Sequence, residues 1–248
     1  GQRHSTVDYK RPAEQLDWML GQGVSVSMYM FHGGTNFWYM NGANTAGGYR
    51  PQPTSYDYDA PLGEWGNCYP KYYAFREVIQ KHLPHGTVLP EVPADNPTTT
   101  FATIELKESA PLQAAFHQTT ESENVLSMED LGVDFGYIHY QTTINKAGKQ
   151  KLIIQDLRDY AVILVDGKQV ASLDRRYNQN NVMLDIQKAP ATLEILVENT
   201  GRVNYGPDIL FNRKGITNQV LCGDEKLTGW SITPLPLYKE KVSEMNFG

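Results

Sequence analysis

Two segments of this chain place aromatic rings among amide and hydroxyl groups, a mixture suited to a polyhydroxylated ligand. The first, YMFHGGTNFWYMNGAN, covers residues 29–44, and the second, TSYDYDAP, covers residues 54–61. Aromatic rings can cover the apolar faces of a sugar while polar groups bind its hydroxyls. A purely structural turn needs a glycine and something polar, but it does not need so many rings. These two segments therefore predict a carbohydrate site.

Two other interpretations of the second segment remain open. Asp57 and Asp59 resemble the DxD signature with which some glycosyltransferases hold a divalent metal and a nucleotide sugar. In an extended segment these aspartates would lie on one side and Tyr56 and Tyr58 on the other. The tyrosines could also do no more than pack in a rigid loop, because aromatic residues are often structural.

Other chemistries have little support in the sequence. It contains no phosphate-binding glycine loop, GxSxG, HExxH or nucleophilic cysteine setting, and Cys68 and Cys222 stand outside any metal-finger spacing. His82 and His85 are separated by Pro84, which breaks a shared helical face. We therefore expect no metal and no cofactor.

Composition narrows the possible partners. The 248 residues carry a net charge of -6, which argues against a nucleic-acid partner because phosphates are neutralised by clustered Lys and Arg. No apolar run approaches the eighteen or so residues of a membrane span, so we expect no membrane partner. The opening residues, GQRHSTVDYK, show no targeting signal.

The site segments lie in a long loop between predicted elements. Residues 12–20, PAEQLDWML, begin with proline and stop before glycine, and residues 70–83, PKYYAFREVIQKHL, also open on proline, so both predict helices. Between them, VSVSMYMF at residues 24–31 alternates with a period of two and predicts a strand with both faces buried. A lone strand between two helices cannot bury both faces, so residues 1 to about 83 look like part of a larger α/β domain.

The second half of the chain predicts an antiparallel β-sandwich. Four prolines within residues 84–97 mark a domain boundary. Asp166-Gly167 is a strong hairpin signal between two strand-like runs. The predicted strands are FATIEL (101–106), FGYIHYQTTI (135–144), KLIIQDL (151–157), YAVILV (160–165), KQVASL (168–173), NVMLDI (181–186) and ATLEILV (191–197).

In chain order, GGTNF, NGAN, QPTSYDYDAPLGEWG and VENTGRVNYG resemble the β-galactosidases of glycoside hydrolase family 35. The most specific pieces are MYMFHGGTNF and PTSYDYDAP. The resemblance implies an α/β plus all-β fold class, with the C-terminal helix-strand-helix part of a (β/α)8 TIM barrel at residues 1–90. A β-sandwich of the galactose-binding-like or jelly-roll kind is then expected at residues 91–248.

The same resemblance implies a retaining exo-β-galactosidase that removes terminal β-D-galactosyl residues. The acid/base glutamate and the nucleophilic glutamate of the family lie on barrel strands four and seven, which we expect upstream of this chain. No catalytic residue is therefore expected here, and the chain alone is expected to be inactive. By position, Tyr29, Tyr56 and Tyr58 match the family's tyrosines that surround galactose, and inward-pointing Tyr29 suits the end of a barrel strand.

The resemblance also suggests partners and a compartment. The expected partners are a β-galactoside substrate and the remainder of the chain's own barrel. An extracytoplasmic location (periplasmic, secreted or lysosomal) is slightly favoured. The alternative function is a non-catalytic galactose-binding or interaction module. For VENTGRVNYG a structural role is favoured, because Gly201, Asn204 and Gly206 are turn residues first.

Overall fold

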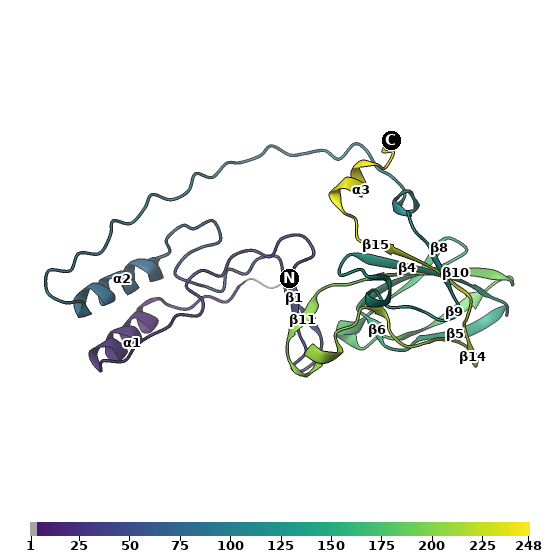
Figure 1. Ribbon diagram of the computed structural model, residues 1–248, viewed down its shortest axis with the longest axis horizontal. Coiled ribbons are helices and arrows are strands. Elements are labelled where there is room, and N and C mark those ends of the chain that lie inside the picture. The colour runs from purple at the N-terminus through teal and green to yellow at the C-terminus, as the bar shows by residue number, and fades with distance from the viewer. Residues whose placement is uncertain (1–3) are drawn as a thin grey trace. The chain divides into compact units, whose positions relative to one another are not determined.

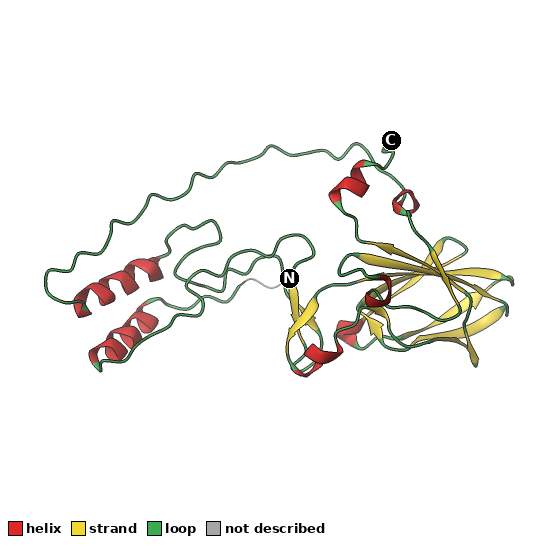
Figure 2. Ribbon diagram, in the orientation of Figure 1, coloured by secondary structure: helices red, strands yellow, loops and turns green. Residues whose placement is uncertain are grey.

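The structure, a computed structural model, describes residues 4–248. The chain divides into two compact units, one made of Gly1–Phe37 and Pro53–Ile104 and the other of Trp38–Gln52 and Glu105–Gly248. The first unit carries the two long helices and the second carries the sheets (Figures 1 and 2). The predicted division placed residues 1–90 in one domain and residues 91–248 in another. The structure groups Trp38–Gln52 with the later part of the chain.

Both predicted helices of the first unit are confirmed. They are α1 (Lys10–Gly21) and α2 (Pro70–His82), and proline occupies the first position of α2, where no backbone N–H is needed. The helices pack against each other, and Asp17 of α1 accepts hydrogen bonds from Lys81 and His82 of α2. Among their residues only Ala13 and Leu16 are buried, so this helix pair has little apolar core of its own.

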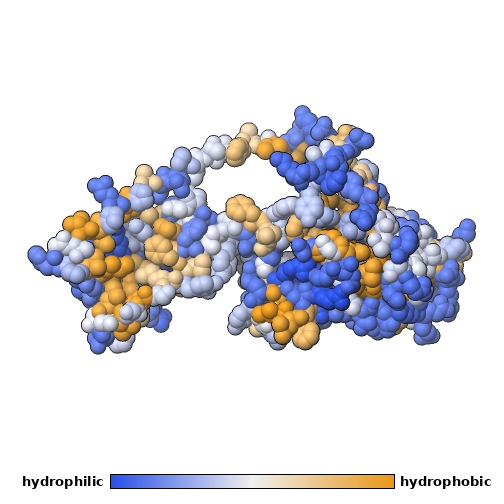
Figure 3. All heavy atoms as spheres, in the orientation of Figure 1, coloured by the Kyte–Doolittle hydropathy of each residue, from blue (hydrophilic) through white to orange (hydrophobic). Residues whose placement is uncertain are grey.

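The predicted strand at residues 24–31 is wrong for this structure. The segment is irregular and turns at Tyr29 and Met30, and the side chains of Val24, Val26 and Phe31 are exposed rather than buried on two faces. A strand exists only through hydrogen bonds to a neighbour, and residues 4–248 place no strand beside this segment. No barrel sheet is visible in the described first unit, so the barrel portion stays a prediction. Hydrophobic residues gather on the surface of the unit that carries α1 and α2 (Figure 3, orange).

The predicted strand at residues 101–106 is also wrong. This segment has no regular structure, and Phe101, Ile104 and Leu106 are exposed. Its apolar residues satisfied the sequence pattern, but the described residues bring no partner strand to them.

The second unit is an antiparallel β-sandwich, as predicted. Its larger sheet has the order β3 (Thr120–Ser122), β15 (Trp230–Leu235), β4 (Tyr137–Ile144), β10 (Ala191–Glu198), β7 (Tyr160–Val165) and β8 (Lys168–Asp174). The smaller sheet has the order β14 (Glu225–Lys226), β13 (Val220–Cys222), β5 (Gly148–Ile154) and β9 (Asn181–Ile186). A short pair joins β6 (Leu157–Arg158) to β12 (Gly215–Ile216). The connections include the 3-10 turns Leu112–Ala115, Glu129–Leu131, Arg175–Tyr177 and Pro207–Phe211, and a short helix α3 (Lys239–Ser243) lies near the end of the chain.

One apolar core lies between the two sheets. Along β10 every second side chain is buried, and these pack in one cluster with inward side chains of β5, β9 and β13. The hairpin predicted at Asp166-Gly167 joins β7 to β8, and both residues have positive φ (49° and 74°), as a type I′ turn requires. The alternation of apolar and polar residues and the turn residues thus predicted the sandwich correctly.

A small hairpin from the long loop adds a third sheet to the second unit. Strands β1 (Gly42–Asn44) and β2 (Arg50–Pro51) pair antiparallel, and β1 pairs in parallel with β11 (Arg202–Tyr205). A side chain at Gly201 would meet the carbonyl oxygen of Gly42 at 2.5 Å, so glycine permits this close approach. The VENTGRVNYG motif therefore has a structural partner, in line with the structural role favoured for it.

Candidate functional site

The three tyrosines singled out in the sequence come together in the first unit. The hydroxyl oxygens of Tyr29 and Tyr56 are 3.3 Å apart. The ring of Tyr58 lies edge-on to Tyr29, with centroids 5.9 Å apart, and 5.4 Å from the ring of Tyr56. Tyr29 is 76% exposed and Tyr58 is 51% exposed. Tyrosines that serve only packing bury their rings, whereas Tyr29 and Tyr58 present theirs at a surface and Tyr56 is half-buried between them and the loop.

The double glycine and Glu64 hold Tyr56 in this cluster. A Cβ on Gly33 would lie 1.8 Å from the carbonyl oxygen of Tyr56, so the two backbones touch directly. The backbone N–H of Tyr56 donates to the carbonyl of Gly34 at 2.9 Å and to Glu64 Oε1 at 3.2 Å. Thr35 Oγ1 donates to the same carboxylate oxygen at 3.0 Å. The GGTN sequence thus sets the position of Tyr56.

The segment after Tyr56 is not extended, contrary to expectation. Tyr58 and Asp59 have positive φ (62° and 49°), so the backbone turns where an alternating strand was expected. The two tyrosine rings are neighbours because of this turn. Asp57 and Asp59 consequently do not form a separate face of an extended strand.

Both aspartates hold the loop from within. Asp57 accepts hydrogen bonds from the Tyr69 hydroxyl and from the backbone N–H of Asp59, each at 3.0 Å. Asp59 pairs with Lys71 Nζ at 2.8 Å and accepts a hydrogen bond from the backbone N–H of Val7. Because both carboxylates bind partners within the loop, the geometry does not support the interpretation of Asp57 and Asp59 as a metal-binding DxD motif. Among residues 4–248, no three His, Cys, Asp or Glu side chains are grouped so as to hold a metal ion.

The surroundings of Tyr56 favour its protonated hydroxyl. The hydrogen bond with Tyr29, followed by burial and the neighbouring phenols, raises the pKa of Tyr56 to about 12. Tyr56 therefore keeps its proton over the physiological range and can donate a hydrogen bond to a ligand oxygen. Two histidines of this unit have polar partners: His82 is paired with Asp17, and His32 Nε2 lies 3.4 Å from the carbonyl oxygen of Glu64.

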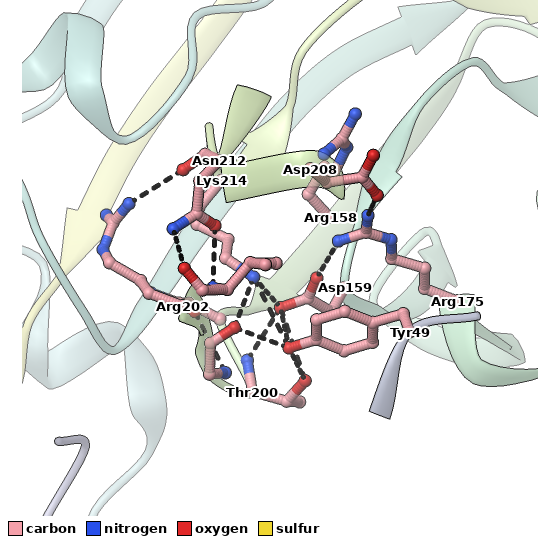
Figure 4. A network of polar contacts seen from close by, with 12 residues as sticks. Tyr49, Arg158, Asp159, Arg175, Thr200, Arg202, Asp208, Asn212 and Lys214 are labelled. Atoms are coloured by element: carbon pink, nitrogen blue, oxygen red, sulfur yellow. Dashed lines mark hydrogen bonds and ion pairs between the residues drawn. The ribbon is translucent and has the colours of Figure 1, made fainter. Parts of the chain in front are cut away.

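A buried polar network in the second unit was missed by the sequence analysis (Figure 4). Tyr49, from the turn between β1 and β2, is 5% exposed. Its hydroxyl lies 2.9 Å from Asp159 Oδ2, 2.9 Å from Thr200 Oγ1 and 2.7 Å from the carbonyl oxygen of Gly201. Lys214 Nζ lies 2.6 Å from the same Asp159 oxygen. The network thus joins residues that are far apart in the sequence.

Cations flank the ring as well as the hydroxyl of Tyr49. The guanidinium of Arg175 lies 4.4 Å from the ring centroid and Lys214 Nζ lies 4.8 Å from it, both suited to cation–π attraction. Arg175 also pairs with the second Asp159 oxygen at 3.0 Å. Burial lowers the pKa of Lys214 to about 8, against the opposing attraction of Asp159. A lone tyrosine in GGYRP carries no pattern that would predict such partners.

The comparisons with known proteins match both parts of the chain. The family model described as "Glycosyl hydrolases family 35" matches residues 1–82, and the one described as "Beta-galactosidase, first all-beta domain" matches residues 125–236. The first match contains the tyrosine cluster and the second contains most of the sandwich. None of the helices described within residues 4–248 is long and apolar enough to cross a membrane.

Three relatives named "Beta-galactosidase" match nearly the whole chain. The protein of Xanthomonas manihotis is 41% identical over 96% of this chain and 40% of its own length. That of Mus musculus is 41% identical over 95% of this chain and 37% of its own, and that of Homo sapiens is 38% identical over 95% and 35%. The chain therefore spans well under half the length of these relatives. With the matches of both parts in order along the sequence, the chain is similar to glycosyl hydrolase family 35 over residues 1–82 and to the first all-beta domain of β-galactosidases over residues 125–236.

Proposed function

We propose that the complete protein is a retaining exo-β-galactosidase that hydrolyses terminal β-D-galactosyl residues, and that this chain supplies part of its galactose-binding surface. The observation that carries the proposal is the cluster of Tyr29, Tyr56 and Tyr58, which unites hydroxyls and exposed rings from segments 27 residues apart. Rings and hydroxyl donors in this arrangement suit a sugar, whose faces are apolar and whose edge carries hydroxyls. The relatives named β-galactosidases support the choice of galactose.

The chemistry requires groups that we assign to other segments of the complete protein. Retaining hydrolysis uses two carboxyl groups about 5 to 5.5 Å apart, one as acid/base and one as nucleophile. Near the tyrosines, Asp57, Asp59 and Glu64 are held by hydrogen bonds or an ion pair inside the loop. We therefore propose that both catalytic glutamates precede Gly1 and that this chain alone is inactive.

The remainder of the barrel is the partner proposed for the first unit. Residues 24–31 alternate as a strand would, yet Val24, Val26 and Phe31 are exposed and the segment has no neighbouring strand within residues 4–248. A parallel strand on each side would satisfy its backbone groups and cover these side chains. In that setting the tyrosine cluster would follow the carboxyl end of the strand, where barrel enzymes carry their active sites.

Replacing each tyrosine by phenylalanine in the complete protein tests the proposal. The substitution removes the hydroxyl and keeps the ring, so a residue that only packs is little affected. A hydroxyl that bonds a charged group in the transition state is worth on the order of 1.5 to 3 kcal/mol, a loss of roughly ten- to a hundredfold in kcat/KM. The measurement is turnover of a chromogenic β-galactoside, with Tyr177→Phe as control because Tyr177 is an exposed tyrosine of the second unit.

Two outcomes would contradict this function. Full kcat/KM in Tyr29→Phe, Tyr56→Phe and Tyr58→Phe would show that these tyrosines only pack. Galactose binding by the complete protein without any turnover would favour the alternative, a non-catalytic galactose-binding module.

A further inference from the structure

We infer that an aromatic surface of the second unit binds a neutral sugar ring. The surface, which we call the aromatic platform, is formed by the rings of Trp38, Tyr39, Phe135 and Tyr238. Beside it lies a cavity of about 230 Å³, lined by Tyr39, Met40, Asn41, Asp134, Phe135 and Arg202. All of these residues belong to the second unit. The inference does not rest on the proposed function, because sugar binding is measured without turnover.

Phe135 lies at the centre of the platform. Its ring centroid is 5.1 Å from that of Trp38 and 5.5 Å from that of Tyr238. The ring of Tyr39 is stacked against it, 5.8 Å away and within 12° of parallel. Trp38 is 58% exposed and Tyr238 is 42% exposed, and within residues 4–248 the apolar core between the sheets includes none of the four rings. Exposed rings that the core does not use are suited to the apolar face of a sugar.

Asn41 offers a free hydrogen-bond acceptor at the cavity. Its Nδ2 donates to the carbonyl oxygens of Thr200, at 2.7 Å, and of Gln52, at 3.1 Å. These carbonyl partners determine which end of the amide is the NH2 group, so the other end is the oxygen Oδ1. No group within residues 4–248 donates a hydrogen bond to that oxygen. A ligand that binds it must bring a donor, and a sugar hydroxyl is one.

Asp134 supplies a second free acceptor, which is charged. The residue is exposed, and in the described part of the chain, residues 4–248, its carboxylate has neither a hydrogen bond nor an ion pair. The other charge at the cavity, on Arg202, is paired with Glu129 Oε1 at 2.6 Å. The Asp134 carboxylate therefore sets the charge preference of the site: it accepts strong hydrogen bonds from sugar hydroxyls and repels an acidic sugar.

The buried residue Asn199 holds the cavity in shape. Its side-chain Nδ2 donates to the carbonyl oxygen of Asp134, and its backbone N–H donates to that of Gly136, both at 3.0 Å. Both neighbours of Phe135 are thus fixed before any ligand arrives, and a preformed site loses little entropy on binding. The volume of about 230 Å³ is below the roughly 300 to 1,000 Å³ of sites for drug-sized molecules, so it suits one sugar ring.

Two substitutions test the site by removing one contact each. Trp38→Ala removes a ring from the platform. Asp134→Ala removes the free carboxylate, while the backbone carbonyl of this residue keeps the bonds that shape the cavity. Tyr177→Ala and Asp185→Ala are the matched controls, because they remove an exposed ring and an exposed carboxylate elsewhere in the same unit.

The experiment measures sugar binding by the complete protein. The probes are two neutral sugars that resist hydrolysis, methyl β-D-thiogalactoside and methyl β-D-thioglucoside, and one acidic sugar, methyl β-D-glucuronide. Backbone hydrogen exchange of peptides that cover residues 38–41 and 133–137 reports binding at the site as the sugar concentration rises. For at least one neutral sugar we expect slower exchange in both peptides, with a Kd on the order of 1 mM. The glucuronide should bind at least about tenfold more weakly.

The variants should separate this site from any other sugar site. Trp38→Ala and Asp134→Ala should each weaken the binding reported by these peptides at least about tenfold, with an unchanged unfolding transition, and both controls should match wild type. Slower exchange that persists in both variants would show that the sugar does not bind through these residues and would overturn the inference.

Other results would also overturn it. Unchanged exchange in both peptides, up to about twentyfold the expected Kd of either neutral sugar, would show that the site binds no sugar ring. Equal binding of the glucuronide would contradict the preference for a neutral sugar. Platform rings that are shielded from hydroxyl radicals in the sugar-free complete protein would show that another segment covers them. Binding at the platform without any β-galactosidase activity would refute the proposed function alone, whereas an active enzyme without this binding would refute this inference alone.

Discussion

Gly33→Ala should displace Tyr56 without removing any functional group. The added Cβ would lie 1.8 Å from the Tyr56 carbonyl oxygen and 2.8 Å from that of Asp57, both backbone atoms. Ordinary contact begins at 3.4 Å, so the two backbone segments must separate by about 1.6 Å along the shorter contact. No flexible side-chain end is available to absorb the shift. The change therefore acts on the position of the tyrosine cluster rather than on its chemistry.

The size of the effect follows from that displacement. The hydrogen bond from the Tyr56 N–H to the Gly34 carbonyl, 2.9 Å long, cannot survive a shift of this size, and the distance of 3.3 Å between the hydroxyls of Tyr29 and Tyr56 would change with it. A misplacement of about 1 Å can cost on the order of a hundredfold in rate. We expect kcat/KM of the complete enzyme to fall by at least about thirtyfold, and the free energy of unfolding to fall by about 1 to 3 kcal/mol from overpacking.

Gly23→Ala provides the matched control for this prediction. Gly23 lies in the same unit, and a Cβ there would meet nothing within 4 Å. Its φ of 71° makes alanine strained, so stability should fall by about 1 to 2 kcal/mol while kcat/KM stays at the wild-type value. Chromogenic turnover and urea denaturation measure the two quantities on each variant. If Gly33→Ala keeps kcat/KM within twofold of wild type, the tyrosine cluster does not depend on this backbone contact and the site geometry argued above is wrong.

Two further predictions concern the second unit. Lys214 has a pKa of about 8 when folded and about 10.4 when unfolded, so between these values the unfolded chain binds more protons and the free energy of unfolding should rise with pH, by up to about 1.4 kcal/mol per unit. Urea denaturation from pH 7 to 10 should show this rise in wild type and not in Lys214→Met, and an equal rise in both would contradict the assignment. Gly215→Ala should destabilise the second unit by about 2 to 3 kcal/mol, because φ at this position is 92° and the added Cβ would lie 2.4 Å from the Tyr140 hydroxyl. That hydroxyl donates to the Leu126 carbonyl and accepts from the Ile216 N–H, so it cannot move away without losing these bonds. Gly148 has a similar φ of 94°, but a Cβ there would meet nothing within 4 Å, so Gly148→Ala should lose only the stability that backbone strain costs. Equal losses of stability in the two variants would rule out the clash with Tyr140.

Local signals predicted the local elements well. Prolines near helix starts, Gly21 at the end of the first helix, and Asp166-Gly167 between two alternating runs all act within a few residues, and the elements they predict are present. The strand predicted at residues 24–31 failed for a different reason. Its alternation is genuine, but a strand requires hydrogen-bonding neighbours, and residues 4–248 supply none there.

The site could be predicted only in part. The resemblance singled out Tyr29, Tyr56 and Tyr58, and the structure brings these three together. Neither the turn at Tyr58 nor the network around Tyr49 followed from the sequence. Tyr49 and Lys214 are 165 residues apart, and a single tyrosine and a single lysine form no periodic pattern, so only the folded chain shows that they meet.

Strand β1 comes from the first half of the sequence, yet it is completed by β11 of the second half. A gene fusion that exchanged everything after the proline-rich segment for the equivalent part of another protein would leave β1 against a foreign strand. It would also separate Tyr49 from the Asp159–Lys214 pair and leave a buried charge pair short of one partner. At these positions a change in one half of the sequence therefore requires a matching change in the other half. The proline-rich segment separates the two halves in sequence, but it does not make them independent in evolution.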